Sequence, residues 1–280
     1  MKFYRYKRIC NFIILVLSTL AVLPLAEASD APSSDKQPCL DCTDSPTQIQ
    51  LDIASIDWCP YICPLSKDRP GVLIEYVREI FKGSDVNLTF TPMPWARAIH
   101  ETKSGRFNAL LAPAKEEAPG LVYPLEHLAH QHMCFFVRNN DPWRYQEPSS
   151  LQGRRVIYAY SSFPKSLEGT QQLATFYPIP YYDKFVTRAT KMLMNNRFNT
   201  LLFTYYSTLD YLQRNKLEQK IMVSGCVQRQ AVYLAFTPQP SQSESIGQLI
   251  ELVDQRVSEL RKDKTLDRLL SEYGLEPFKP

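Results

Sequence analysis

The sequence predicts an α/β fold with two similar lobes, because one unit of it occurs twice. Arg97–Leu111 reads RAIHETKSGRFNALL and Arg188–Leu202 reads RATKMLMNNRFNTLL, and seven of the fifteen aligned positions are identical. Each copy has the pattern of a helix, a turn that contains Gly105 or Asn196, and an apolar strand. The copies begin 91 positions apart, which is too far for a solenoid. Two such lobes imply a cleft between them, and a cleft implies a ligand.

The segments around the first copy follow the order of a parallel sheet with helical crossovers. The pattern predicts a strand at Ile49–Ser55, a helix at Val72–Phe81 and a strand at Val86–Thr91, after which Pro94 begins the helix of the first copy. An order of β-α-β-α-β is typical of a parallel sheet with helices on its faces.

A second series of the same kind begins at Arg155. It predicts strands at 156–160, 176–179 and 198–203, and helices from about 165, at 185–195 and at 205–214. Short apolar strands are expected at 133–137 and 231–236, and two amphipathic helices, at about 246–261 and 266–273, follow. If this last part returns to the first lobe, the strands near Cys134 and Cys226 cross between the lobes as a hinge. We expect Trp143 to pack at the lobe boundary.

The N-terminus has the pattern of a cleavable secretory signal peptide at residues 1–28. Four basic residues precede an apolar run, and Ala26-Glu27-Ala28 is a small-x-small cleavage site. A retained membrane anchor is the alternative, although polar residues and Pro24 interrupt the run. Cleavage changes the balance from 32 basic and 29 acidic residues to 28 of each, so the product is neutral and nothing favours nucleic acid as a partner. Residues 29–47, rich in Ser, Pro and Asp, are expected to form a flexible leader.

Six cysteines follow the signal segment, and an even number in an exported chain favours disulfides. The expected bridges are Cys39–Cys42, Cys59–Cys63 and Cys134–Cys226. The first two pairs, with sixteen residues between them, also come close to the spacing of a zinc ribbon. Cys134 and Cys226 could equally be two buried free thiols.

Several short motifs together resemble a known family. They are Asp57-Trp58-x-Pro60-Tyr61, Pro70-Gly71, Met93-Pro94-Trp95-x-Arg97-Ala98, Gly105-Arg106-Phe107-Asn108, Tyr233-Leu234-Ala235-Phe236 and the ending LDRLLSEYG at 266–274. Their order and spacing, over about residues 48–275, resemble family 3 of the extracytoplasmic solute-binding proteins, which are two-lobed type II periplasmic binding proteins. The resemblance implies a first lobe from 48–137 and 231–280, a second lobe from 138–230, a mixed sheet flanked by helices in each lobe, and a two-strand hinge.

The resemblance also implies a function. Such proteins are periplasmic receptors that close like a Venus flytrap on a small polar solute and often deliver it to an ABC importer, or signal through a membrane sensor. We therefore expect a monomer that binds a small-molecule solute, with no cofactor and no nucleic-acid partner.

The residues beyond the two repeat copies depart from the amino-acid receptors of this family. Those receptors grip the ligand carboxylate with an arginine after the strand in the first lobe, whereas the corresponding stretch Ala112–Ala118 contains none. Lys115 could substitute, but Glu116 and Glu117 beside it would repel a carboxylate. Thr204 stands near the place where an aspartate usually receives the ligand ammonium. These departures argue against a standard α-amino acid as the ligand.

Residues at the strand ends are the candidate ligand contacts, because ligands of α/β sheets lie beyond the carboxyl ends of the strands. They are Asp57, Trp58, Tyr61, Trp95, Arg97, Lys115, Ser161, Ser162, Thr204 and Tyr205. Each of these aromatic, charged or hydroxyl side chains could instead have a purely structural role. Trp58 or Trp95 could pack in the core, Arg97 could pair with Glu101, and the serines could cap a helix.

Two other functions compete with solute binding. An enzyme on the same scaffold, such as a dehydratase or a cell-wall-linked enzyme, would need an acid-base carboxylate in the cleft, and Asp57 and Glu75 are the obvious ones. A structural or adhesive exported protein would not need aromatic residues at strand ends. A metal cluster of Glu126, His127, His130 and His132 is conceivable, but a solvated segment that leads into the hinge is favoured.

Overall fold

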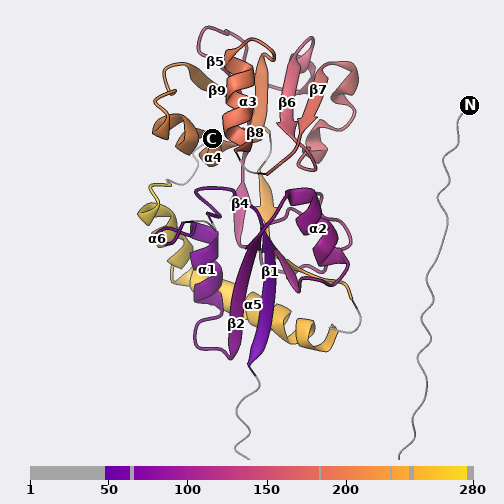
Figure 1. The fold of residues 1–280 in the computed structure, drawn as a ribbon, viewed down its shortest axis with the longest axis vertical. Coiled ribbons are helices and arrows are strands. Elements are labelled where there is room, and N and C mark those ends of the chain that lie inside the picture. The colour runs from indigo at the N-terminus through magenta and orange to yellow at the C-terminus, as the bar shows by residue number, and fades with distance from the viewer. Residues whose placement is uncertain (1–47, 64–65, 183, 228, 240–242, 276–280) are drawn as a thin grey trace, which may run out of the picture. The chain divides into compact units, whose positions relative to one another are not determined.

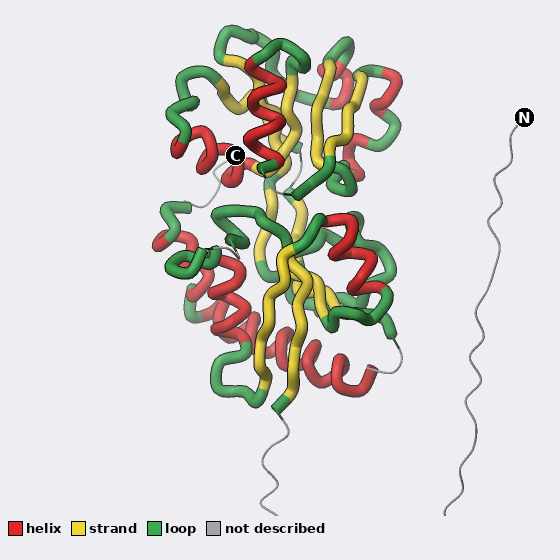
Figure 2. Tube along the Cα trace, in the orientation of Figure 1, coloured by secondary structure: helices red, strands yellow, loops and turns green. Residues whose placement is uncertain are grey.

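A computed structural model describes residues 48–63, 66–182, 184–227, 229–239 and 243–275. Within this range the chain forms two larger sheets with helices on their faces and one two-stranded sheet (Figures 1 and 2). The expected signal segment, the leader and the pair Cys39 and Cys42 lie outside the described residues. No helix of the described part is both long enough and apolar enough to cross a membrane.

The first sheet has the strand order β11-β3-β1-β2. Its strands and helices are β1 (Ile49–Ser55), α1 (Val72–Ile80), β2 (Val86–Pro92), α2 (Trp95–Lys103), β3 (Ala109–Leu111) and β11 (Leu234–Phe236). β1 pairs parallel with β2 and β3, and β11 pairs antiparallel with β3. The later helices α5 (Ser243–Lys262) and α6 (Thr265–Glu272) pack on α1. The C-terminal part therefore returns to the first lobe, as its pattern predicts.

The second sheet has the order β7-β6-β8-β5-β9. Its elements are β5 (Met133–Arg138), β6 (Arg155–Ala159), β7 (Thr175–Ile179), α3 (Phe185–Met194), β8 (Thr200–Thr204), α4 (Tyr205–Arg214) and β9 (Ile221–Cys226). Alternate residues of its strands face two apolar clusters: Phe136, Ile157 and Leu201 belong to one, and Phe135, Val156 and Leu202 to the other. This alternation places core on both faces of the sheet, since successive side chains of a strand point to opposite faces.

The two repeat copies adopt the same structure. The helix of each copy, α2 or α3, leads through a turn to β3 or β8. Gly105 and Asn196 occupy that turn with φ of 84° and 58°, the left-handed region that favours Gly and Asn. The prediction of two similar α/β units is confirmed.

The strands that form the hinge differ from the strands predicted. β4 (Ala129–Gln131) and β10 (Gln230–Val232) pair antiparallel and connect the two sheets along the chain (Figure 2). β5, by contrast, pairs with β8 and β9 in the second sheet, so the expected boundary at residue 137 falls inside that sheet. The apolar run at 231–236 is divided at Tyr233 into β10 of the hinge and β11 of the first sheet, because the chain changes partners there.

Two further predictions were wrong in detail. The segment from Lys165 forms only short 3-10 turns at Lys165–Leu167 and Thr170–Gln172, since a left-handed Gly169 interrupts any longer helix. Trp143 packs against Phe135 of the second sheet, with its ring centroid 5.7 Å away, and its indole N–H donates to the Ser150 carbonyl at 2.7 Å. It is therefore a packing residue of the second lobe itself.

Two disulfides lie at the positions that the cysteine pattern favours. Cys134 and Cys226 join β5 and β9 at a directly paired position, beside the point where both strands leave the hinge. Cys59 and Cys63 close a short loop after β1. In the structure Cys134 and Cys226 are therefore bridged rather than free thiols, and Cys59 and Cys63, two of the four cysteines of the zinc alternative, are bridged to each other.

Candidate functional site

A small cavity with a largely buried lining, here called the central cavity, lies where strand ends of both sheets meet. Its volume is about 10 Å³, close to what a single water molecule needs. The lining residues come from the first lobe, the hinge and the second lobe: Ile56, Trp58, Trp95, Leu111, Ala112, Glu117, Gln131, Ser162, Tyr181, Phe203 and Thr204. Four of the ten predicted contacts, Trp58, Trp95, Ser162 and Thr204, are therefore brought together around one point.

Hydrogen bonds between the lobes close this cavity. The Trp58 indole Nε1 donates to Thr204 Oγ1 at 2.9 Å, and the Trp95 backbone N–H donates to the Tyr181 carbonyl at 3.2 Å. Ser162 Oγ donates to Glu117 Oε1 at 2.5 Å. Side chains of the protein thus occupy the position where a bound molecule would contact both lobes.

Glu117 supplies the charge of the central cavity. Its second carboxylate oxygen accepts the backbone N–H of Ala114 at 3.0 Å. Burial raises the pKa of Glu117, and hydrogen bonds from Ser162, Ala114 and the Gln131 side chain offset part of that rise. The carboxyl group is therefore held in place and its charge is incompletely compensated.

Trp95 presents an unused donor. The side chain is 3 % exposed and lines the central cavity, and among the described residues its Nε1 has no hydrogen-bond partner. Buried indole N–H groups usually find an acceptor. Trp95 therefore combines a core position with a polar group that a ligand could satisfy.

The loop that carries Trp58 and Tyr61 is held firmly on the first lobe. Carbonyls of Pro60 and Tyr61 accept the first backbone N–H groups of α1, from Val72 at 3.2 Å and Leu73 at 2.9 Å. Gly71 adopts φ of 111°, and a Cβ there would lie 2.5 Å from the Tyr61 carbonyl oxygen, so only glycine fits.

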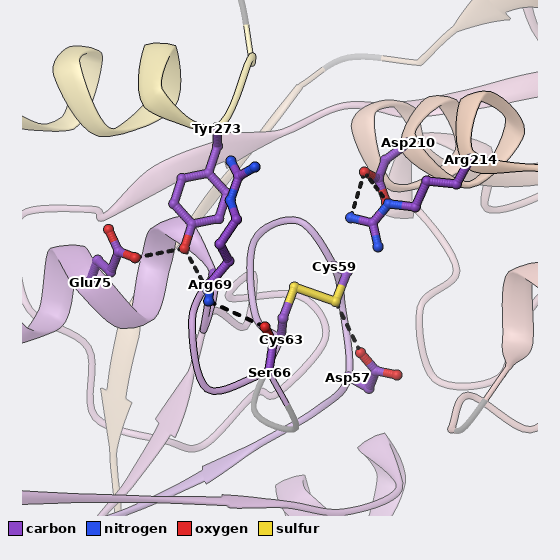
Figure 3. The surroundings of a disulfide bond; sticks show 10 residues. Asp57, Cys59, Cys63, Ser66, Arg69, Glu75, Asp210, Arg214 and Tyr273 are labelled. Carbon is purple, nitrogen blue, oxygen red and sulfur yellow. Dashed lines mark hydrogen bonds and ion pairs between the residues drawn. A yellow bond between two sulfur atoms is a disulfide. The ribbon is translucent and has the colours of Figure 1, made fainter.

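The base of this loop is anchored by the C-terminal helix (Figure 3). The Tyr273 hydroxyl donates to Glu75 at 2.7 Å and accepts the Gly71 N–H at 3.0 Å, while the Arg69 guanidinium lies 4.5 Å from the Tyr273 ring centroid. Glu75, one of the carboxylates that an enzyme would need, is thus engaged in fixing the loop.

Trp58 and Tyr61 stack on each other at a centroid distance of 4.4 Å, yet they face different spaces. Trp58 lines the central cavity, whereas Tyr61 lines a separate pocket of about 370 Å³ and meets Tyr206 edge-on. Asp57 lines a third pocket, of about 230 Å³, opposite the Asp210–Arg214 ion pair of α4 (Figure 3). Tyr61 and Asp57 therefore flank the central cavity.

Arg97, Tyr205 and Ser161 do not line the central cavity. Arg97 forms the alternative ion pair with Glu101 at 3.3 Å and is largely exposed. Tyr205 begins α4, and its backbone N–H donates to the His132 carbonyl. Ser161 supplies a left-handed turn, with φ of 64°, that directs Ser162 into the cavity.

A basic pocket of about 390 Å³ adjoins the same stretch of chain. Lys115, Lys165 and Arg229 line it together with Glu116. The Lys115 ammonium lies 4.8 Å from the centroid of the Tyr233 ring and so points away from the central cavity, which it does not line.

His127, His130 and His132, in and beside hinge strand β4, line the 370 Å³ pocket with Arg229, Arg261 and Lys264. Burial and the charges of neighbouring histidines and arginines lower the pKa of His130 to about 4. Glu126 is paired with Arg261, and the described residues contain no group of three metal-ligating side chains in suitable positions. The positive surroundings disfavour a cation here.

Sequence reasoning missed Glu117, Gln131 and Tyr181 as cavity residues. Glu117 lies in the stretch after the first repeat copy, which was singled out for its lack of arginine, but its side chain was interpreted only as a neighbour of Lys115. The left-handed Ala112, with φ of 65°, turns the chain so that Glu117 faces the second lobe. No local pattern predicts that direction.

No protein-family profile and no curated protein sequence matches the chain. Solved structures do resemble it. The P235GK mutant of ArgBP from T. maritima matches with a TM-score of 0.65 and 14 % identity, over 81 % of this chain and 96 % of that one. A histidine kinase sensor domain with similarity to periplasmic binding proteins matches with a TM-score of 0.64 and 16 % identity, over 81 % and 98 %.

The GluR0 ligand-binding core from Nostoc punctiforme, solved in complex with L-glutamate, matches with a TM-score of 0.61 and 17 % identity, over 80 % of this chain and 99 % of that one. Nearly the full length of each of these proteins is covered. The chain therefore has the two-lobed type II periplasmic-binding-protein fold that its motifs predict.

Proposed function

We propose that this protein is an exported solute-binding protein that captures a small polar molecule between its two lobes. The observation that carries the proposal is the central cavity, where polar side chains from both lobes converge at the carboxyl ends of parallel strands. A ligand that replaces the bonds of Trp58 to Thr204 and of Glu117 to Ser162 would contact both lobes at once, which is how a ligand biases closure.

The solved structures with this fold support binding rather than catalysis. ArgBP, the GluR0 ligand-binding core and the sensor domain carry names of binding or sensing proteins. Delivery of the solute to an ABC importer and signalling through a membrane sensor are both consistent with the fold. The signal pattern at 1–28 supports release into the periplasm.

An enzyme on this scaffold is the second candidate, and Glu117 is the observation that favours it. A partly buried carboxyl group with a raised pKa has the properties expected of a general acid or base. The described lining of the cavity offers no second titratable carboxylate or histidine to share proton transfer, so binding is the better supported function.

A thermal-shift screen of the chain without residues 1–28 tests the proposal. The screen covers amino acids, amines, polyamines, organic acids and aromatic compounds, which differ in charge and in aromatic character. At least one class should raise the melting temperature in a saturable way, by an amount that follows its concentration relative to Kd. An absence of any stabilisation, or turnover of a compound without stoichiometric binding, would contradict the receptor.

A further inference from the structure

One acidic side chain and no basic one line the central cavity. Among its described lining residues, Glu117 is the only one with a carboxyl, ammonium, guanidinium or imidazole group. Both carboxyl oxygens have hydrogen-bond donors, Ser162 Oγ and the Ala114 N–H, but neither donor carries a charge. Glu117 is partly buried, and an ionised carboxylate withdrawn from water without a counter-ion is costly, so a cation beside it would reduce that cost.

The other walls of the cavity also suit a cation. Trp58, Trp95, Tyr181 and Phe203 surround the space with aromatic rings, and all four side chains are buried. Aromatic ring faces attract ammonium and guanidinium groups, most strongly where water is excluded. Burial and the nearby Glu117 raise the pKa of Tyr181, so its phenol stays neutral and adds no competing charge.

We propose that the central cavity binds the positively charged head of a small organic cation, an ammonium or a guanidinium group, with Glu117 as its counter-ion. This inference rests on the proposed function and names the class of its ligand. The unpartnered Trp95 Nε1 would serve an acceptor atom elsewhere on the same molecule. A carboxylate is excluded from this position, because it would face Glu117 with no basic group among the described lining residues.

Basic side chains line the adjoining pockets rather than the central cavity. Lys115, Lys165 and Arg229 line the basic pocket, where Lys115 is held over the Tyr233 ring. Lys184 and Arg214 line the pocket of Asp57, which shares Trp58, Tyr181 and Phe203 with the central cavity. Arg214 is paired there with Asp210.

Entry of a cation requires the lobes to open. The cavity has room for about one water molecule, so the ligand must replace the bond between Ser162 and Glu117 and separate Trp58 from Thr204. Closure would then be driven by contacts of the cation with Glu117 on one lobe and with Tyr181 and Phe203 on the other.

Isothermal titration calorimetry with matched probes tests the proposal. Phenethylamine and agmatine carry the cationic head, 2-phenylethanol and 3-phenylpropionate replace it by a neutral or a negative group, and phenylalanine adds a carboxylate beside it. At least one of the two cations should bind, and it should bind more tightly than 2-phenylethanol and 3-phenylpropionate. The variant Glu117→Gln, which keeps an acceptor for Ser162, should weaken cation binding by about 30-fold or more, the usual effect of removing one partner of a buried charge pair.

Glu116→Gln is the matched control, since it removes the same charge from the exposed neighbouring residue. It should change the affinity by about threefold or less. Cation binding that Glu117→Gln leaves unchanged would overturn the assignment of Glu117. Binding of 3-phenylpropionate or other acids without binding of either cation would contradict a cationic ligand but agree with the proposed solute-binding function. No binding of any class, here and in the thermal-shift screen, would overturn both.

Discussion

Asn108 in the first lobe and Asn199 in the second perform the same task at the end of their repeat copies. The Asn108 side-chain oxygen accepts the Asp52 N–H at 2.8 Å and its own N–H donates to the Asp52 carbonyl at 2.9 Å. Asn199 repeats both bonds with Arg155, at 2.8 and 3.3 Å. In each lobe the asparagine thereby joins the strand of the repeat to the central parallel strand.

The copies diverge immediately after their strands. The first copy continues into the left-handed Ala112 and the turn that presents Glu117, whereas Thr204 ends the second copy and begins α4. The framework of the two lobes is thus the same, while the walls that they offer to the cleft differ in charge. The first lobe contributes the carboxyl group of Glu117 and the second contributes the hydroxyls of Ser162 and Thr204, while both contribute aromatic rings. The repeat therefore specifies the sheets, and the residues after it give the two lobes different walls at the central cavity.

The largest effect that we expect is the difference in stability lost when each of the two disulfides is removed. Cys134 and Cys226 are 92 positions apart and Cys59 and Cys63 only 4, so chain entropy predicts a loss of about 4 to 5 kcal/mol for the first bridge and about 2 kcal/mol for the second. The double variants Cys134→Ala/Cys226→Ala and Cys59→Ala/Cys63→Ala can be compared by urea unfolding under non-reducing conditions. A larger loss for the short bridge would contradict the entropic account.

Replacement of either asparagine should lower the free energy of unfolding by the same amount. Asn108→Ala and Asn199→Ala each leave one backbone N–H of the central strand without its acceptor, which predicts a loss of about 1 to 3 kcal/mol in the free energy of unfolding. Chemical denaturation measures both variants, and Asn87→Ala, an exposed site on β2, serves as a control. A large loss at one asparagine and none at the other would show that the copies are not equivalent.

Trp58→Phe should loosen the closed arrangement without unfolding either lobe. The change keeps an aromatic ring but removes the indole N–H that reaches Thr204, a bond with a net contribution of about 0.5 to 1.5 kcal/mol. Small-angle scattering of the ligand-free protein should show a larger radius of gyration than in the wild type. Phe substituted for Trp143, which bonds within the second lobe, should leave the radius unchanged.

The smallest effect that we expect is a pH dependence due to Glu117. Because its folded pKa is raised, the group contributes stability at low pH, and that contribution is lost as pH rises from about 4.3, the ordinary value for glutamate, through the folded pKa. Glu116, Tyr123 and Tyr181 face it, and the two tyrosines remain neutral over this range.

Melting temperatures of the wild type, Glu117→Gln and Glu116→Gln across pH 4 to 8 measure this contribution. Relative to the wild type, Glu117→Gln should gain stability as pH rises, whereas Glu116→Gln should follow the wild type. Parallel curves for all three proteins would show that the Glu117 carboxyl keeps an ordinary pKa.

Most secondary structure could be predicted because it depends on local patterns. The expected strand at 49–55 and the helix at 205–214 agree with β1 and α4 at both ends. The run at 231–236 was misjudged, because apolar residues alone do not reveal that consecutive strands pair with different sheets. The predicted helix from Lys165 failed for a local reason, since the left-handed Gly169 divides the segment into two short 3-10 turns.

The candidate site was predictable in its aromatic and hydroxyl parts. Trp58, Trp95, Ser162 and Thr204 follow strands of parallel sheets, and strand ends of both lobes meet at the cleft by topology. Arg97 and Tyr205 satisfy the same rule but point elsewhere, because the direction of a side chain on the first turn of a helix depends on its partners.

The sequence by itself determined that there are two lobes and where their repeated units lie, because periodicity and turn residues are local properties. Only the tertiary structure decided which of Lys115, Glu116 and Glu117 faces the central cavity. The three side chains are adjacent in sequence, and the turn at Ala112, the backbone N–H of Ala114 and the hydroxyl of Ser162 on the opposite lobe select the last of them. That selection needs contacts between residues far apart in the chain, and it decides that an acidic rather than a basic side chain lines the central cavity.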